Sequence, residues 1–301
     1  MQNQTKDNSA APGSGGRTDA PASPVHPNGG GITAAGGFPQ EVVLGAEAAG
    51  GEAALRLDKR TYLDREQGHF TVVLRDYGGG FCEAGWSFVS NLQAFKAARG
   101  ESEQRQVHED RASRRARSRL RQLILSANAD HLLTLTYREN VTDFGQASQD
   151  LASLIRRVRK HLPHWVFIAV PEQQKRGAWH WHLAVVGRQD VKLLRHLWRS
   201  VVGEGNIDVQ RPKAGINRRL AIVNYLGKYL AKGFAEGGRE LNGHRYRASL
   251  GIKVPSESLS LPQHLRGDVS AYVRSQLHLR AGKVGFVWVD SQNTAGWACS
   301  W

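Results

Sequence analysis

Two neighbouring segments in the middle of the chain constrain the fold most, because each has the pattern of a β-strand. Residues 165–170 form a nearly continuous apolar run between Pro163 and Pro171, which is typical of a strand covered on both faces. A polar turn over residues 171–177 follows, and residues 178–186 run out again in an extended pattern. We therefore expect an antiparallel hairpin at the centre of a sheet.

The segments on either side of this hairpin alternate between strand and helix patterns. Residues 131–137 and residues 206–210 have the β-prone composition of strands. Apolar residues recur every three or four positions in three predicted helices, over residues 151–162, 190–201 and 217–234. This order of elements predicts an α+β fold in which helices pack on one side of a central antiparallel sheet.

The remaining segments carry weaker patterns. Residues 1–50 are rich in Gly, Ala, Pro, Ser and Asn, and we predict a disordered tail because so few large apolar side chains cannot offset the entropy of ordering. Residues 51–130 are predicted to form an accessory region, with short strands first and an Arg-rich helix over residues 86–127. Residues 131–235 form the predicted core, and residues 236–301 a C-terminal extension.

Positive charge is concentrated in the predicted core. The whole chain has 41 Lys and Arg against 27 Asp and Glu, and residues 131–235 alone hold 17 basic and 7 acidic side chains. Such an excess attracts a polyanion, most often nucleic acid. The candidate DNA contacts are four arginines of the Arg-rich helix and one of the hairpin turn: Arg114, Arg115, Arg117, Arg121 and Arg176.

Cysteine usage and hydropathy narrow the location of the protein. Two cysteines, Cys82 and Cys299, are too few for a structural zinc site or a disulfide framework, which is consistent with a reducing cytosol. The sequence has no apolar run near the length of a membrane span and no signal-peptide core. We therefore expect a cytoplasmic protein with no membrane partner.

Two histidines in the second arm of the hairpin are candidate metal ligands. Because side chains alternate along a strand, His180 and His182 project from the same face. Two imidazoles and a carboxylate from Glu172, across the turn, form a set that binds a divalent ion and leaves positions open for a phosphate oxygen. Gln173 or Gln174 can replace Glu172, because sequence does not fix the hairpin register. The alternative is two ordinary histidines beside a solvated carboxylate.

The predicted helix over residues 217–234 has two distinct faces. One strip carries two tyrosines and two lysines, namely Tyr225, Lys228, Tyr229 and Lys232. A separate apolar strip consists of Val223, Leu226, Leu230 and Phe234. Either the tyrosines extend the packing face while the lysines reach past them to solvent, or the strip presents chemical groups.

Three segments, taken in chain order, resemble the three motifs of rolling-circle replication initiators, the His-hydrophobic-His endonucleases: residues 133–137, 171–182 and 224–232. The pair of tyrosines is similar to the branch that contains the gene A proteins of isometric single-stranded DNA phages. This resemblance spans about residues 131–235 and implies an RRM-like or ferredoxin-like palm. One departure is the bulky Trp181 between the histidines, which we expect to face the core.

The resemblance also implies an activity. Tyr225 and Tyr229 are then the nucleophiles that nick and rejoin single-stranded DNA at an origin through a 5′-phosphotyrosine. Lys228 and Lys232 then assist by lowering the tyrosine pKa or by contacting the phosphate. His180, His182 and Glu172 then hold Mg²⁺ or Mn²⁺.

The expected partners follow from a motif that is missing. The sequence contains no Gly-x-x-x-x-Gly-Lys-Ser/Thr motif, which a helicase-like phosphate loop would require. A host helicase and polymerase are therefore the expected partners in replicating a plasmid or phage.

Three other functions fit parts of the pattern. A paired-tyrosine transposase, or a relaxase, uses the same kind of site. A non-catalytic DNA-binding regulator needs only the Arg-rich helix. A non-haem iron oxygenase uses two histidines and a carboxylate, but it has no need for a basic surface or for paired Tyr and Lys residues.

Overall fold

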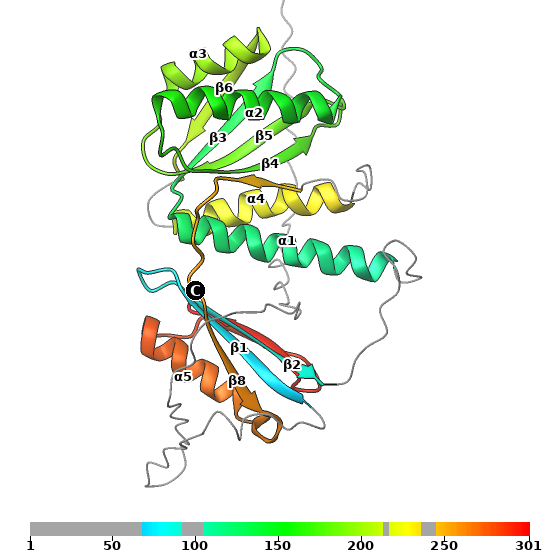
Figure 1. The fold of residues 1–301 in the computed structure, drawn as a ribbon, viewed down its shortest axis with the longest axis vertical. Coiled ribbons are helices and arrows are strands. Elements are labelled where there is room, and N and C mark those ends of the chain that lie inside the picture. Colours follow the sequence, from blue (N-terminus) through cyan, green and yellow to red (C-terminus); the bar gives the residue numbers. More distant parts are fainter. Residues whose placement is uncertain (1–67, 92–104, 213–216, 236–244) are drawn as a thin grey trace, which may run out of the picture.

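The computed structural model describes residues 68–91, 105–212, 217–235 and 245–301 (Figure 1). The predicted disordered tail, residues 1–50, lies outside the described residues. No helix in the described ranges combines the length and the apolar composition needed to cross a membrane.

The described residues form ten strands, five α-helices and a short 3-10 helix. The helices are α1 Arg105–Ala127, α2 Phe144–His161, α3 Val191–Val202, α4 Arg218–Ala235, η1 Gln263–Leu265 and α5 Val269–Ala281. The first six strands are β1 Gly68–Asp76, β2 Cys82–Ser90, β3 His131–Tyr137, β4 Phe167–Gln173, β5 Trp179–Val185 and β6 Gly205–Gln210. The others are β7 Arg247–Ala248, β8 Glu257–Pro262, β9 Phe286–Val289 and β10 Ala295–Cys299.

The strands form two antiparallel sheets, which confirms the α+β class but differs from the single sheet predicted. The sheet that we call sheet A has the order β8-β1-β2-β10-β9. Sheet B has the order β6-β3-β5-β4-β7, with the predicted hairpin, β4 and β5, at its centre. Figure 1 shows α1 lying between the two sheets.

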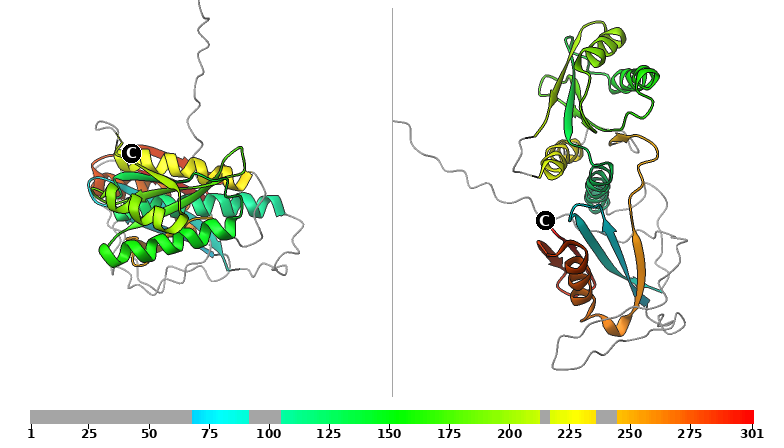
Figure 2. Two further views of the ribbon diagram at one scale, coloured as in Figure 1. Left: turned by 90° about the horizontal axis from the view of Figure 1, so that it is seen from above. Right: turned by 90° about the vertical axis from the view of Figure 1, so that its left-hand side faces the viewer.

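Alternation along β5 divides the core of sheet B into two layers. Trp181 and Leu183 pack with α2 and α3, whereas Ala184 belongs to a cluster with α1 and α4. Helices therefore cover both faces, as the right-hand view of Figure 2 shows, and the prediction of helices on one side was wrong. The physical reason is that α4 has its own apolar face, on which Leu226 and Leu230 are buried against the sheet.

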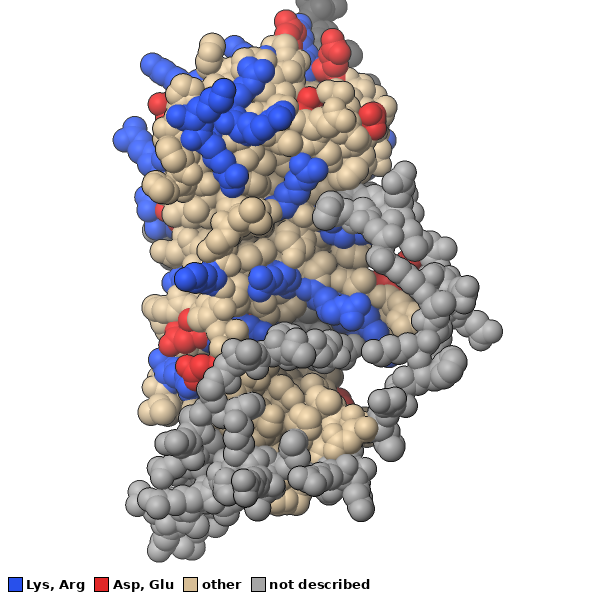
Figure 3. Space-filling model, viewed as in Figure 1, with Lys and Arg blue, Asp and Glu red and all other residues tan. Residues whose placement is uncertain are grey.

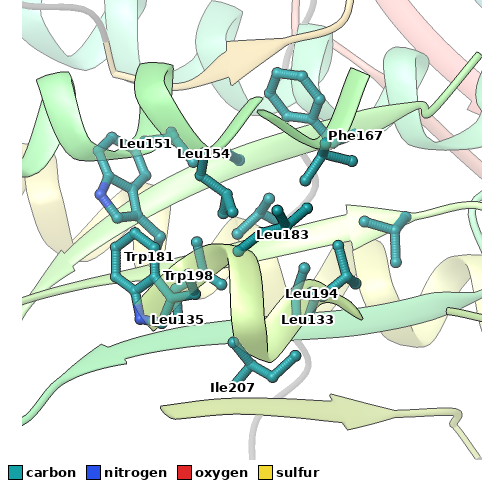
Figure 4. Close-up of a cluster of buried hydrophobic side chains, with 14 of the residues drawn as sticks. Leu133, Leu135, Leu151, Leu154, Phe167, Trp181, Leu183, Leu194, Trp198 and Ile207 are labelled. Atoms are coloured by element: carbon teal, nitrogen blue, oxygen red, sulfur yellow. The ribbon is translucent and has the colours of Figure 1, made fainter. Parts of the chain in front are cut away.

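Trp181 is a core residue, as predicted from its position between the histidines. Its side chain is 1% exposed, and its indole N–H donates a hydrogen bond of 3.0 Å to the carbonyl of Ala147 on α2. Figure 4 shows it in the cluster with Leu135 and Leu151. A buried tryptophan at this position fixes the register of β5, since a shift of one residue would turn the histidines into the core.

Sheet A joins the two ends of the described chain. β1 pairs with β2 and β8, β2 pairs with β10, and α5 covers one face. Residues 86–90 belong to β2, so the prediction that the Arg-rich helix starts at residue 86 was wrong. Trp86 is buried on the α5 side and Ser87 is only half-buried, which is a strand pattern.

A buried carboxylate connects α1 to sheet A. Glu83 on β2 is fully buried and accepts hydrogen bonds from Arg121 Nε on α1 at 2.9 Å, the Tyr77 hydroxyl at 2.7 Å and Trp297 Nε1 at 3.3 Å. Burial opposes the charged form, but the guanidinium groups of Arg121 and Arg75 outweigh it and lower the pKa of Glu83. The C-terminal half of α1 also packs on α4, so α1 links the two sheets.

Candidate active site

The two histidines of β5 lie on the face of sheet B that α4 covers. His180 is 8% exposed and His182 is 5% exposed, so both imidazoles are largely shielded from water. In the hairpin register, Glu172 on β4 is opposite His180. The strand alternation and the hairpin thus place the three predicted ligands on one surface of the sheet.

Each histidine is held by a neighbour at Nδ1. His182 Nδ1 lies 3.2 Å from the hydroxyl of Thr134 on β3, and its Nε2 lies 2.8 Å from Glu172 Oε2. His180 Nδ1 lies 3.2 Å from the side-chain amide of Gln174, whereas its Nε2 is buried without a hydrogen-bond partner. The Nε2 atoms of both rings are therefore the ones left for Glu172 or for a ligand.

Within the described residues, no three His, Cys, Asp or Glu side chains are gathered as a ready-made metal site. The donor set is nevertheless chemically suited to a divalent cation. Burial lowers the pKa of both histidines, and the neutral form that this favours is the form that binds metal. The unpartnered Nε2 of His180 and the carboxylate beside His182 supply the kinds of ligand atom that such an ion requires.

The paired tyrosines of α4 lie directly on this surface. The ring of Tyr229 stacks on His182, with centroids 4.2 Å apart and an angle of 16° between the planes. Tyr225 meets both rings edge-on, at 5.5 Å from His182 and 4.9 Å from Tyr229. The two hydroxyl oxygens are 3.4 Å apart, so both groups occupy one small region beside the histidines.

The surroundings of Tyr225 disfavour its ionised form. Burial first, then the hydrogen bond from Tyr229 and the negative charges of Glu172 and Asp208, raise its pKa. Its side chain is still 36% exposed, so solvent reaches it.

The two lysines of α4 have different surroundings. Lys232 Nζ donates to Glu172 Oε1 at 3.2 Å and to the carbonyl of Gln173 at 3.0 Å, whereas Lys228 is exposed. The expectation that lysines lower the tyrosine pKa does not match this arrangement, since Lys232 holds the carboxylate instead.

The predicted DNA-contacting arginines are divided among three environments. Arg115 on α1 and Arg176 in the β4–β5 turn are exposed, whereas Arg114 and Arg117 are half-buried. Arg121 is 8% exposed and ion-paired with Glu83 at 2.8 Å, so its prediction as a DNA contact was wrong. Helix composition favoured all of them equally, but only the position of α1 against sheet A shows which ones face solvent.

Two residues of the site were not recognised as such in the sequence. Thr134 lies opposite His182 in the pairing of β3 with β5, a register that follows only from the folded sheet. Gln174 was considered as a third ligand, but it contacts His180 Nδ1 instead. The available signal for Thr134 was its polar side chain at an inward position of an otherwise apolar strand.

Comparison with known proteins identifies one part of the chain. Residues 130–234 match the family model described as replication-associated protein ORF2/gene II protein. No curated protein matches the sequence significantly. Among solved structures, the hypothetical protein ORF119 from Sulfolobus islandicus rod-shaped virus 1 is similar at 10% identity, over 42% of this chain and 97% of that chain, with a TM-score of 0.29. At that TM-score the likeness carries no argument about fold or function.

Proposed function

Because residues 130–234 carry a domain of the replication-associated ORF2/gene II protein family, we propose that this protein initiates rolling-circle replication by nicking and rejoining single-stranded DNA at an origin. One observation carries the proposal: two tyrosine hydroxyls lie 3.4 Å apart beside a buried histidine pair. In the same proposal, sheet B is the RRM-like palm of the His-hydrophobic-His endonucleases.

Tyr225 attacks first, because it is the more exposed of the two tyrosines. Its hydroxyl oxygen bonds to the scissile phosphorus, the bond from phosphorus to the 3′-oxygen breaks, and the 3′-oxygen takes up a proton while the phenolic proton passes to solvent. The resulting 5′-phosphotyrosine keeps the energy of the broken ester, so a later attack by a 3′-hydroxyl rejoins the strand without ATP. The raised pKa of Tyr225 keeps the hydroxyl protonated until a substrate is in place.

Tyr229 supplies the second cleavage. Since its hydroxyl lies 3.4 Å from that of Tyr225, both oxygens can reach a phosphate bound at the same place. A protein already joined to DNA through one tyrosine can therefore cut again with the other. Release of a unit-length circle requires such a second cut.

His180, His182 and Glu172 would hold the metal, Mg²⁺ or Mn²⁺, which when bound polarises the scissile phosphate and stabilises the charge that develops on it. The protein's own groups prepare this site. The hydroxyl of Thr134 orients the ring of His182, and Lys232 keeps Glu172 beside it.

Contacts with the DNA backbone come from exposed cations near the site. Lys228 is exposed one helical turn from the tyrosine pair and contacts the phosphate, while Arg115 and Arg176 contact the flanking backbone. A host helicase and polymerase complete replication, in keeping with the sequence-based expectation.

The test is to incubate the protein with labelled single-stranded origin DNA and Mn²⁺, and then to detect an SDS-resistant protein–DNA adduct. Tyr225→Phe should weaken the adduct, and Tyr225→Phe with Tyr229→Phe should abolish it while DNA binding persists. Full adduct formation by the double variant would refute the assignment. If no cognate strand gives an adduct with the unaltered protein, the non-catalytic regulator replaces the enzyme, and strand transfer into unrelated DNA would identify a transposase.

A further inference from the structure

The outer surface of α2 and α3 carries a group of basic side chains that the proposed cleavage does not use. We call it the back surface, and its members are Arg156, Arg157, Arg159 and Lys160 on α2 with Lys192, Arg195 and Arg199 on α3. Six of the seven are exposed, and Arg195 is half-buried. Figure 3 shows Lys and Arg side chains gathered over this part of the molecule.

The positive charge of the back surface is not compensated. Asp150 is the only acidic residue within α2 and α3; it is 8% exposed and accepts hydrogen bonds from Tyr137 and Gln146. Where the basic groups have partners, these are neutral: Arg157 donates to Ser200 at 2.6 Å, and Arg199 donates to the carbonyl of Gly205 at 3.2 Å. Within the described residues, none of the seven forms an ion pair with a carboxylate.

The back surface faces away from the catalytic groups. α2 and α3 pack on the face of sheet B opposite α4, which carries the tyrosines, and Figure 2 shows the two layers on opposite sides of the sheet. A strand bound at His182 therefore lies beyond the reach of these side chains. Whatever binds the back surface is a different molecule or a different segment of the same DNA.

The arrangement of the charges fits a phosphate backbone. Lys192, Arg195 and Arg199 recur at intervals of three and four residues, so they form one stripe along α3 about 10 Å long at 1.5 Å per residue. Arg157 links this stripe to α2 through Ser200. A row of cations on adjacent helices can contact successive phosphates, with no need for base recognition.

The chemistry of the back surface favours nucleic acid over a protein partner. Among the described residues, the exposed large hydrophobic side chains all lie outside α2 and α3. A protein interface usually needs an apolar or aromatic centre, which this surface lacks. Charge without apolar anchors is the signature of contacts to a phosphate backbone.

We propose that the back surface binds the backbone of a second DNA segment, such as the duplex that flanks the nicked strand or the displaced strand. The inference rests on the proposed function only in taking DNA as the ligand. It predicts that DNA affinity and strand cleavage respond to different substitutions.

The test uses the full chain and two separate triple variants, Arg156→Gln/Arg159→Gln/Lys160→Gln on α2 and Lys192→Gln/Arg195→Gln/Arg199→Gln on α3. The charge-matched control replaces three exposed cations beside sheet A, Lys253→Gln/Arg274→Gln/Lys283→Gln. Affinity for a short duplex and for one of its single strands is measured by fluorescence anisotropy over a range of salt concentrations. Circular dichroism verifies that each variant is folded.

Each back-surface variant should reduce the slope of log affinity against log salt by up to about 2.7 with duplex or about 2.1 with single strand, if all three residues contact phosphates. The larger effect identifies which form of DNA is bound. Cleavage of a short strand that only spans the nick site should be unchanged, and the control should keep the wild-type slope.

Unchanged slopes in both folded back-surface variants would overturn the inference, and an acidic protein partner would then be sought. Failure of the proposed function has a different signature. In that case no adduct forms with any variant, yet the back-surface variants still lose affinity for DNA.

Discussion

Replacing Arg121 tests whether α1 is held on sheet A by a buried ion pair. Arg121→Met keeps much of the side-chain length but leaves Glu83, which is fully buried, without the guanidinium that donates to it at 2.8 and 2.9 Å. Tyr77 and Trp297 still donate, and Arg75 lies 3.9 Å away. The carboxylate thus loses its closest positive charge while it stays out of water.

Breaking a buried pair by removing one partner costs roughly 3–5 kcal/mol. The remaining donors to Glu83 place the expected loss near the lower limit, about 3 kcal/mol. Since a domain is stable by only about 5–15 kcal/mol, this loss is large enough to measure as a shift of the urea midpoint at constant slope.

The pH dependence gives an independent signature. The pKa of Glu83 is lowered in the folded protein, so its contribution to stability is present above the unfolded pKa of about 4.3 and is lost as pH falls through the folded value. In Arg121→Met the main cause of that lowering is removed while burial remains. The stability deficit of the variant should therefore shrink as the pH is lowered.

Two controls accompany the measurement. Arg115→Met changes an exposed arginine of the same helix and should alter stability by less than about 0.5 kcal/mol. The double variant Arg121→Met/Glu83→Leu removes both charges and should recover much of the loss, because an apolar pair often replaces a buried ion pair at little cost. Equal stabilities of Arg121→Met and wild type at neutral pH would show that the pair does not hold α1 to sheet A.

Three further outcomes follow from the site and from sheet A. Thr134→Val should weaken Mn²⁺ binding by roughly 10–100-fold in calorimetry, whereas Thr134→Ser retains the hydroxyl and should bind normally; equal affinity in both variants would exclude an orienting role. His180→Ala, or EDTA added to the wild type, should reduce adduct formation by about two orders of magnitude without changing the circular dichroism spectrum, and persistent activity in EDTA would remove the metal from the proposal. A chain ending at Ala235 lacks β8, β10 and α5, so amide exchange in β1 and β2 should rise strongly, and unchanged protection there would show that this hairpin is stable alone.

Local periodicity was sufficient to predict the centre of sheet B. The apolar run before Pro171 and the alternation around Trp181 involve only residues that are neighbours in sequence, and both strands form where expected. The same holds for α4, predicted over residues 217–234 and observed as Arg218–Ala235. The start of α2 was missed because its cap depends on Asp143, whose carboxylate accepts hydrogen bonds from the backbone N–H groups of Gly145 and Gln146.

Long-range pairing was not predictable from these patterns. Sheet A forms because β1 pairs with β8, a strand almost two hundred residues later, and no period within either segment specifies its partner. In the same way, the contact between Thr134 and His182 depends on the register of β3 with β5. The sequence placed the two histidines on one face, but the groups that orient their rings emerged only from the assembled sheet.

The Arg-rich helix shows how composition alone leaves two functions superimposed. Arg111, Arg115 and Arg119 recur every four residues and are exposed, so they form the stripe available to DNA. Arg114, Arg117 and Arg121 recur at intervals of three and four on the other side, half-buried or buried, and Arg121 closes the ion pair with Glu83. Substitutions in the first stripe should therefore change DNA affinity at constant stability, whereas those in the second should change stability first. Because α1 also packs on α4, loss of the second stripe will reach the tyrosines through the helix contact, and reduced cleavage in such a variant is not evidence of a DNA contact.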